Sequence, residues 1–391
     1  MLKILVAPAS YKGSIAAHRL TTVIARACGD LAKEDIYHLY RNCEIIETPI
    51  ADGGDDTLTS LKLALGGDLV ESDVFGPTGQ TVRAAYLRLP EMVSELAIVE
   101  LALASGIAYL TPEQLAPLAA HTYGTGQLIG HAIAGGAKKI VITVGGSAST
   151  DGGTGALSAI GAKFLDASGR LLSACGGSLL HMAQIDLSEL LLATSGVTFV
   201  VATDVTSPLL GDLGAAAVFG PQKGAGPADV AILDQGLAHF ATLLETNFDP
   251  AYISALRLLP GSGAAGGAGF GFAAVLGAEI VSGFHFLAGL LGLFQKLEWC
   301  DLVIVAEGRL DSQSISGKGV GEIIRLAASM GKTVLALPAQ SDLTAAQLAS
   351  LINAADPAKI VVFPTAHGAP ATEADVSAAT KLALAQLDFG F

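Results

Sequence analysis

Residues 139–153 read KIVITVGGSASTDGG, in which an apolar run leads into two Gly-Gly pairs, three hydroxyl side chains and one acid, Asp151. The apolar run predicts a buried strand. Glycine is unfavourable after a strand unless the backbone turns sharply or approaches another group closely. Ligands of open α/β sheets bind at the carboxyl ends of the strands. The stretch therefore predicts an α/β fold with a candidate ligand loop at this strand end.

The same order of strand, loop and helix recurs near both ends of the chain. Strands are predicted at 2–8, 44–50, 301–308, 333–339 and 359–364. A helix is expected after each of them, and this alternation predicts a parallel sheet. In the middle of the chain, TVRAAYLRL at 81–89 alternates apolar and polar residues, and AKFLDASGRLL at 162–172 predicts a hairpin around Ser168-Gly169. Such patterns are typical of antiparallel pairing.

These patterns predict the domain organisation. A chain of 391 residues is too long for one typical core. We expect a discontinuous domain formed by residues 1–75 and 290–391, and a second α/β domain inserted between them at residues 76–289.

The composition excludes several classes of protein. Half of the chain is apolar, 15% is charged and the net charge is −14, which excludes a disordered or fibrous protein. No basic cluster is present, so we expect no nucleic-acid partner. The most hydrophobic stretch, 270–294, carries Glu279 and His285, and buried helices are a better interpretation than a membrane span. Four scattered cysteines and a short apolar N-terminus favour a cytoplasmic protein. The sequence leaves the choice between monomer and homodimer open.

Six loops carry charged residues, and all of them except 202–208 also contain glycine. They are 10–14, 51–56, 145–153, 202–208, 219–226 and 306–319. Their cations are Lys12, Lys223, Arg309 and Lys318, and their acids are Asp52, Asp151, Asp204, Glu307 and Asp311. Both signs of charge beside exposed amides suit a phosphate group with Mg²⁺, which is the mixture that phosphoryl transfer needs. Gly145, Gly146 and Ser147 would then hold an anion, and Asp151 would hold a metal ion or a substrate hydroxyl.

Other interpretations are weighed against this one. A single Gly-Gly turn is more often structural, and a single Asp often caps a helix. GSGAAG at 261–266 matches the G-x-G-x-x-G pattern of a nicotinamide-dependent dehydrogenase, but no clear strand precedes it. A tight turn that opens a helix is therefore favoured there. The spacings of a Walker A loop, of H-E-x-x-H and of G-x-S-x-G are absent from the sequence.

The loops together resemble the type I glycerate kinases of bacteria. The motifs that carry the resemblance occur in the order of the family from residue 1 to about residue 340: YKGS, ADGG, GPTG, YGTG, GGSASTDGG, DVTSPL, FGPQKGA, GAAGGAG and EGRLDSQSISGK. The resemblance implies ATP-dependent phosphorylation of D-glycerate, to 2-phosphoglycerate, with Mg²⁺. It also implies a Rossmann- or flavodoxin-like parallel-sheet domain made from both chain ends, an inserted mixed-sheet α/β domain, and a cleft between them.

Candidate site residues follow from the loops and this resemblance. As catalytic residues we expect Lys12, Asp52, Asp151 and Asp204. As substrate- or nucleotide-binding residues we expect Ser10, Gly53, Gly54, Gly145, Gly146, Ser147, Lys223, Glu307, Arg309, Asp311 and Lys318. Asp151 and Asp204 are the candidate metal ligands. The sequence leaves open which acid is the general base, and whether the product carries the phosphate at position 2 or 3.

The chain departs from the family pattern at positions that matter. Ala9 stands where the family has Asp after the proline of the first strand, and Asp55-Asp56 replaces Glu-Gly. The loss of a carboxylate at position 9 could cost several kcal/mol of transition-state stabilisation. The alternatives are therefore a catalytically weakened glycerate-kinase-like protein, or a kinase of a related small hydroxy acid.

Overall fold

The computed structural model describes most of the chain and divides into two compact units. The described residues are 1–11, 13–33, 42–50, 57–89, 95–312, 314–315, 319–366 and 370–387. The terminal unit comprises Met1–Asp52, Thr59–Leu65 and Phe284–Phe391. The inserted unit comprises Gly53–Leu58 and Gly66–Gly283.

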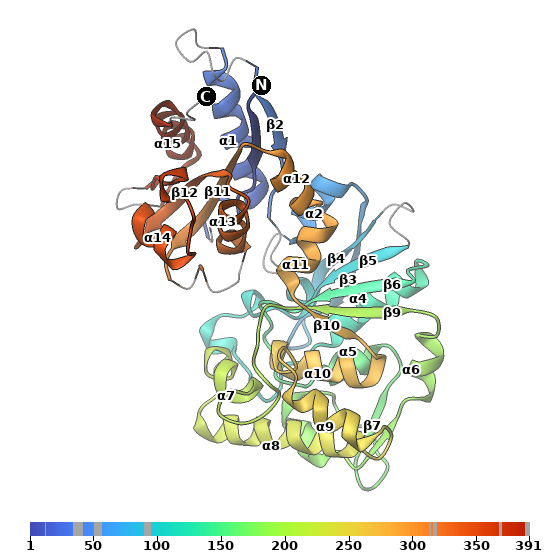
Figure 1. Ribbon diagram of the computed structural model, residues 1–391. Helices are drawn as coiled ribbons and strands as arrows, with labels where there is room; N and C mark the ends of the chain where they lie inside the picture. The colour runs from blue at the N-terminus through green and yellow to red at the C-terminus, as the bar shows by residue number, and fades with distance from the viewer. Residues whose placement is uncertain are drawn as a thin grey trace. The chain divides into compact units, whose positions relative to one another are not determined.

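The terminal unit is built on a five-stranded sheet in the order β13-β12-β11-β1-β2 (Figure 1). Its strands are β1 (Lys3–Val6), β2 (Glu44–Glu47), β11 (Leu302–Leu310), β12 (Thr333–Ser341) and β13 (Ile360–Val362). All neighbouring strands pair in parallel. The predicted parallel sheet from both chain ends is therefore confirmed.

Helices cover both faces of this sheet, as expected for a doubly wound fold. Its helices are α1 (Ala17–Leu31), residues 59–65 of α2 (Thr57–Leu65), α11 (Gly283–Leu290), α12 (Leu293–Trp299), α13 (Gly319–Ser329), α14 (Ala345–Leu351) and α15 (Glu373–Gln386). One core cluster joins one face of the sheet to α12, α13 and α14, and another joins the opposite face to α1 and α15. Helix α13 shows why: Val320, Ile323, Ile324 and Ala327 are buried and lie on one side of the helix.

The inserted unit is built on a six-stranded mixed sheet in the order β10-β9-β6-β5-β4-β3 (Figure 1). Its strands are β3 (Asp68–Phe75), β4 (Thr81–Arg88), β5 (Leu96–Glu100), β6 (Lys139–Thr143), β9 (Thr198–Ala202) and β10 (Glu279–Val281). β4 pairs antiparallel with β3 and β5, and the remaining pairs are parallel. The predicted inserted mixed sheet is confirmed. β3 pairs within this sheet, whereas the predicted boundary at residue 75 grouped it with the N-terminal segment; the domain limits themselves stay a prediction.

The helices of the inserted unit contribute to one large core cluster, which includes alternate residues of β5, β6 and β9 and therefore lies on one face of the sheet. They are α3 (Ala102–Ser105), α4 (Tyr123–Ala134), α5 (Thr154–Ala159), α6 (Ser188–Ala193), α7 (Ala215–Phe219), α8 (Pro227–Leu244), α9 (Pro250–Leu258) and α10 (Ala264–Leu276). Phe240 makes edge-to-face contacts with Phe164 and Phe270, at 6.0 Å and 6.1 Å between ring centroids. Among the described residues, no helix has both the length and the apolar character that crossing a membrane requires.

The predicted hairpin at 162–172 is only partly formed. Strand β7 (Lys163–Leu165) pairs antiparallel with β8 (Gln184–Asp186). The turn around Ser168-Gly169 is nevertheless present, because Leu165 and Leu171 form an isolated bridge across it. The Asp166 carboxylate holds this turn by accepting hydrogen bonds from the backbone N–H groups of Ser168 and Arg170.

Candidate active site

The glycine-rich loop at 144–153 connects β6 to α5 and lies at the carboxyl end of the strand. Gly146 is exposed and has a φ of 69°, in the left-handed region that favours glycine. The loop is tied to the end of α3, because the Gly146 carbonyl accepts from Ile107 N–H at 2.9 Å and Ala148 N–H donates to the Ser105 carbonyl at 3.0 Å. Gly146 is therefore exposed at the surface, while these two hydrogen bonds hold its position relative to α3.

Asp151 is fully buried within this loop and accepts five hydrogen bonds. Its Oδ2 accepts from the N–H and Oγ1 of Thr122, both at 2.8 Å, and from Gly155 N–H at 3.1 Å. Its Oδ1 accepts from Gly153 N–H and Ser149 Oγ, both at 3.2 Å. The carboxylate thus joins the loop to the first turns of α4 and α5. This geometry gives Asp151 a positioning role, and its role as a metal ligand stays a prediction.

Lys223 extends under the same loop from the 3₁₀ turn Pro221–Lys223. Its side chain is buried, and its Nζ donates to Ser147 Oγ at 2.8 Å and to the Ser149 carbonyl at 2.5 Å. Burial lowers the pKa of Lys223 to about 8, and the charge of Asp151 acts in the opposite direction. At neutral pH the amine is therefore mostly protonated, and a positive charge lies directly beneath the loop.

The segment GAAGGAG at 263–269 packs directly against the backbone of this loop. Three consecutive residues at the start of α10, Ala265 to Gly267, have left-handed backbone angles. The Gly266 carbonyl accepts from Gly152 N–H at 3.0 Å, and a Cβ on Gly266 would lie 2.2 Å from the Ser149 carbonyl oxygen. The glycine at position 266 is needed because two backbone segments touch there. This confirms that GSGAAG is a turn that opens a helix.

Asp204 follows β9 and lies in the inserted unit as well. Its Oδ1 accepts from Ser282 Oγ at 2.8 Å, and the side chain is half-buried. Among the described residues, no group of three or more His, Cys, Asp or Glu side chains is arranged to hold a metal ion. The assignment of Asp204 to a metal ion stays a prediction.

Glu307 lies in β11 of the terminal unit, near the carboxyl end of the strand. Its Oε2 accepts from Ser314 Oγ at 3.1 Å, and its Oε1 is buried without a hydrogen-bond partner in the part of the chain that the structure describes. Burial raises the pKa of Glu307 to about 7; the Ser314 hydrogen bond opposes this rise and the charge of Asp311 adds to it. Glu307 is therefore a carboxyl group that titrates near neutral pH.

The other described candidate residues of the terminal unit lie at or just beyond the carboxyl ends of β1 and β11. Asp311 Oδ1 accepts from the Ser314 N–H at 3.2 Å, so Ser314 links it to Glu307. Arg309 is exposed and forms an ion pair with Asp342, with hydrogen bonds of 2.7 and 3.0 Å. Ser10 is half-buried beyond β1, next to Ala9, whose N–H donates to the Ala306 carbonyl at 2.8 Å.

The predicted site residues thus fall into three sets. The inserted unit brings Gly145, Gly146, Ser147, Asp151 and Lys223 into one connected network, with Asp204 at a neighbouring strand. The terminal unit contains Ser10, Glu307, Arg309 and Asp311. Lys12, Asp52, Gly53, Gly54 and Lys318, and also Asp55-Asp56, lie outside the described residues.

Sequence reasoning missed two residues that support the site. Thr122 donates twice to Asp151 and accepts from Ala156 N–H at 2.9 Å, so it links α4 to α5. Glu100 is buried at the end of β5 and accepts from Leu58 N–H at 3.4 Å at the start of α2. Glu100 had a detectable signal, namely an acid that ends the apolar run LAIV, whereas Thr122 had none beyond its place before YGTG.

We expect the Glu307→Gln variant to change how stability depends on pH. Because folding raises the pKa of Glu307 from 4.5 to about 7, the folded state binds the proton more tightly, and the added stability is present below pH 4.5 and lost as pH rises to 7. The shift corresponds to on the order of 3 kcal/mol. Glutamine stays neutral, so the unfolding midpoint of the variant should rise relative to that of the parent from pH 4.5 to about pH 7 and keep a constant difference above it. Calorimetry at each pH measures this, with the exposed Glu298→Gln as control. Parallel curves for Glu307→Gln and the parent would contradict the raised pKa.

Comparisons with known proteins identify the family of the chain. The profile of the Glycerate kinase family matches residues 4–380. Glycerate 2-kinase of Escherichia coli (strain K12) is 37% identical over 336 residues, 86% of this chain and 84% of that protein. Glycerate kinase of Bacillus subtilis (strain 168) is 38% identical over 317 residues, 81% of this chain and 79% of that protein.

The fold is also found in a solved structure. A crystal structure from Salmonella typhimurium LT2, provisionally named glycerate kinase 2, matches with a TM-score of 0.80 at 34% identity and covers 97% of this chain and 94% of that chain. Family profile, relatives and structure agree over most of the length. The chain therefore belongs to the glycerate kinase family and is a small-molecule kinase.

Proposed function

We propose that the protein transfers the γ-phosphoryl group of ATP to D-glycerate by in-line displacement, with Mg²⁺, and forms 2-phosphoglycerate. The 2-position is taken from the name of the Escherichia coli relative, glycerate 2-kinase. The observation that carries the proposal is the loop at 145–149 with the buried cation of Lys223 beneath it. Backbone amides over a fixed positive charge stabilise phosphate oxygens without reorganising during the reaction.

We assign separate roles in this reaction to the described candidate residues. The loop and Lys223 bind and orient phosphate oxygens, and Asp151 keeps the loop in place through its five hydrogen bonds. Within the terminal unit, burial raises the pKa of Glu307 to about 7, a value that suits a group that exchanges a proton near neutral pH. The four free thiols are consistent with the cytoplasmic location expected from the sequence.

Of the two candidate metal ligands, Asp204 is the better candidate for Mg²⁺. Mg²⁺ is usually held by one or two carboxylates together with substrate phosphates, and it neutralises their charge. Asp151 is fully buried and both of its oxygens accept hydrogen bonds, whereas the side chain of Asp204 is only half-buried. We therefore favour Asp204 as the ligand.

The direct test is an assay of the full chain with ATP, MgCl₂ and D-glycerate. We expect ADP and 2-phosphoglycerate in equal amounts, with the position of the phosphate read by phosphorus NMR. L-glycerate and other small hydroxy acids in parallel reactions define the acceptor. Folded protein that makes no ADP at millimolar substrate would contradict the proposal, and preferred turnover of another hydroxy acid would replace D-glycerate by that acid.

Ala9 supports the alternative of a weakened enzyme. On that alternative, Ala9→Asp should raise kcat/KM for D-glycerate at least tenfold, because one well-placed charged group contributes several kcal/mol to a transition state. The position suits this test, since Ala9 is hydrogen-bonded to the residue that precedes Glu307. Ala9→Asn is the matched control for size without charge. An unchanged rate in Ala9→Asp would show that the position tolerates alanine and would remove this alternative.

A further inference from the structure

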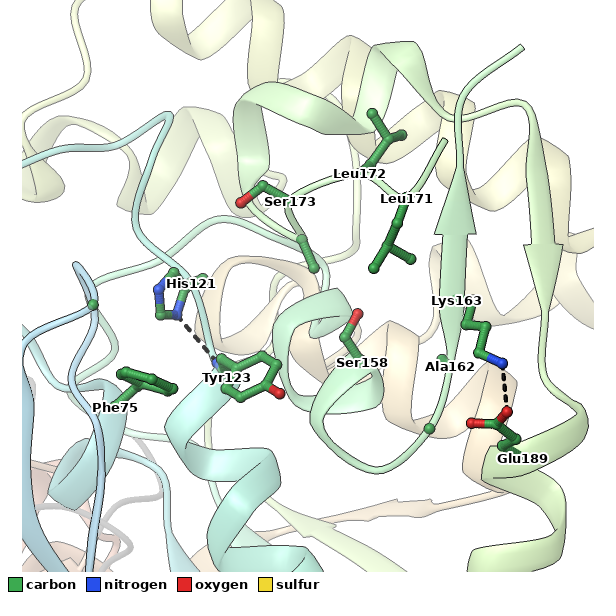
Figure 2. Close-up of a pocket in the computed structure, with 13 residues that line it drawn as sticks. Phe75, His121, Tyr123, Ser158, Ala162, Lys163, Leu171, Leu172, Ser173 and Glu189 are labelled. Carbon is green, nitrogen blue, oxygen red and sulfur yellow. Dashed lines mark hydrogen bonds and ion pairs between the residues drawn. The ribbon is translucent and has the colours of Figure 1, made fainter. Parts of the chain in front are cut away.

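A cavity of about 450 Å³ in the inserted unit is not used by the residues described above (Figure 2). Aromatic side chains form one side of it, and they are Phe75, His121 and Tyr123. Aliphatic side chains from the 162–174 segment form the other side, among them Leu171 and Leu172. The volume lies within the usual range for small-molecule sites, and such sites are mostly apolar with a few placed polar groups.

The aromatic side of the cavity has a defined geometry. The rings of Phe75 and Tyr123 lie edge to face at 5.8 Å, and those of His121 and Tyr123 lie edge to face at 6.3 Å. His121 is oriented by its Nδ1, which accepts from the Tyr123 N–H at 3.3 Å. Phe75 and Leu171 are 43% and 69% exposed. Large apolar side chains on opposite sides of an open cavity favour a ligand that covers them.

The polar groups of the cavity are few and lie at its edges. Ser158 extends from α5 into the space below Leu171 and Leu172 (Figure 2). Lys163 and Glu189 form an ion pair at the side away from the aromatic rings. Two apolar faces with hydroxyl and charged groups at the rim suit a planar heteroaromatic ring, which stacks on its faces and forms hydrogen bonds at its edge.

The cavity is built on the same elements as the glycine-rich loop. Thr122, between His121 and Tyr123, is the residue that donates twice to Asp151. Ser158 belongs to α5, whose first turn Asp151 holds through Gly155. Helix α4 packs on the cavity wall so closely that a Cβ on Gly124 would lie 1.8 Å from the Phe75 carbonyl oxygen. The wall of the cavity and the loop are therefore parts of one connected framework.

We propose that this cavity binds the purine base of the nucleotide, with the phosphates directed towards the loop at 145–149. The proposal rests on the proposed function, because it assigns a part of the nucleotide substrate. It explains why exposed aromatic and aliphatic side chains face each other here. A regulatory nucleotide would be recognised in this cavity by the same contacts as the substrate nucleotide. The effect of a cavity variant on KM for ATP distinguishes the two.

The test fills the cavity in the full-length protein. In Ser158→Phe we expect binding of ADP, measured by calorimetry, to weaken at least tenfold and KM for ATP to rise by a similar factor. KM for D-glycerate should not change. Leu171→Ala removes an exposed wall residue with little effect on folding, and should weaken ADP binding about threefold, as expected for the loss of one apolar contact. Ser195→Phe and Leu192→Ala are the matched controls at exposed positions outside the cavity.

Adenosine, which carries the purine base but no phosphates, tests binding of the base alone. It should raise the unfolding temperature of the parent and of both controls, but not that of Ser158→Phe. Unchanged ADP affinity in folded Ser158→Phe and Leu171→Ala would overturn the proposal while kinase activity stands. Weaker ADP binding with an unchanged KM for ATP would overturn it in favour of a regulatory site. If the parent fails to phosphorylate glycerate, the proposed function fails, and selective loss of adenosine binding in Ser158→Phe would still support a purine site.

Discussion

Replacement of Lys223 by methionine is expected to lower kcat/KM at least a hundredfold while the fold is retained. The variant removes the positive charge under the loop, where Nζ contacts Ser147 and Ser149. Loss of one preorganised group that stabilises charge in a transition state costs about 10²–10³ in rate. Stability should change little, because the desolvation of the amine that lowers its pKa to about 8 is relieved as its two hydrogen bonds are lost. Steady-state kinetics and thermal unfolding measure the two effects.

The pH dependence of the parent tests the same residue. Because only the protonated amine carries the charge, kcat/KM should fall about tenfold per pH unit above pH 8, the value near the lowered pKa of Lys223. This decline should be absent from the residual activity of Lys223→Met. The exposed Lys138→Met serves as control for the loss of a lysine. Parental kinetics in Lys223→Met would remove Lys223 from the active site.

Replacement of Asp151 by asparagine is expected to destabilise the inserted unit and to lower activity more than tenfold. Both oxygens of Asp151 accept hydrogen bonds, and the NH₂ group of an amide must replace one of them. In either orientation the NH₂ group faces N–H or O–H donors that lose their acceptor. Breaking a buried charged network costs about 3–5 kcal/mol, which lowers the unfolding midpoint by roughly 6–20 °C.

Calorimetry of the parent and of Asp151→Asn measures this loss. Asp212→Asn is the matched control, because Asp212 is exposed in the same unit. The two predictions differ in a useful way: Lys223→Met should lose activity with little loss of stability, whereas Asp151→Asn should lose both. An unfolding midpoint equal to that of the parent would show that the five hydrogen bonds do not hold the loop.

Much of the fold could be predicted because its signals are local. Apolar runs such as 139–144 and 301–308 predicted strands, and the loops after them predicted parallel order; both are confirmed by the two sheets. The strand β3 was harder to place, because its sequence alternates only weakly and its partner is set by pairing with β4. The partner of β7 was missed for the same reason, since β8 lies beyond a loop and a 3₁₀ helix.

The roles within the site could be predicted less well. Asp151 and Lys223 were expected to contact ligand, which stays a prediction; the structure adds that both are buried and that Lys223 donates hydrogen bonds to the loop. The raised pKa of Glu307 was not visible in the sequence, because it depends on burial and on Ser314. The cavity at Phe75 and Tyr123 was not visible either, because its walls come from separate helices and loops.

The sequence by itself determined the order of strands and helices, the placing of glycine at loops, and the family. These depend on periodicity and on motifs a few residues long. Only the tertiary structure decided which polar groups are enclosed, which of them meet, and where a cavity is left. Ser147 and Lys223 are 76 residues apart, and yet they share a hydrogen bond. Such contacts bury some side chains and leave others exposed, and burial determines the protonation state of a side chain and its access to ligand. The order of residues along the chain does not contain this information.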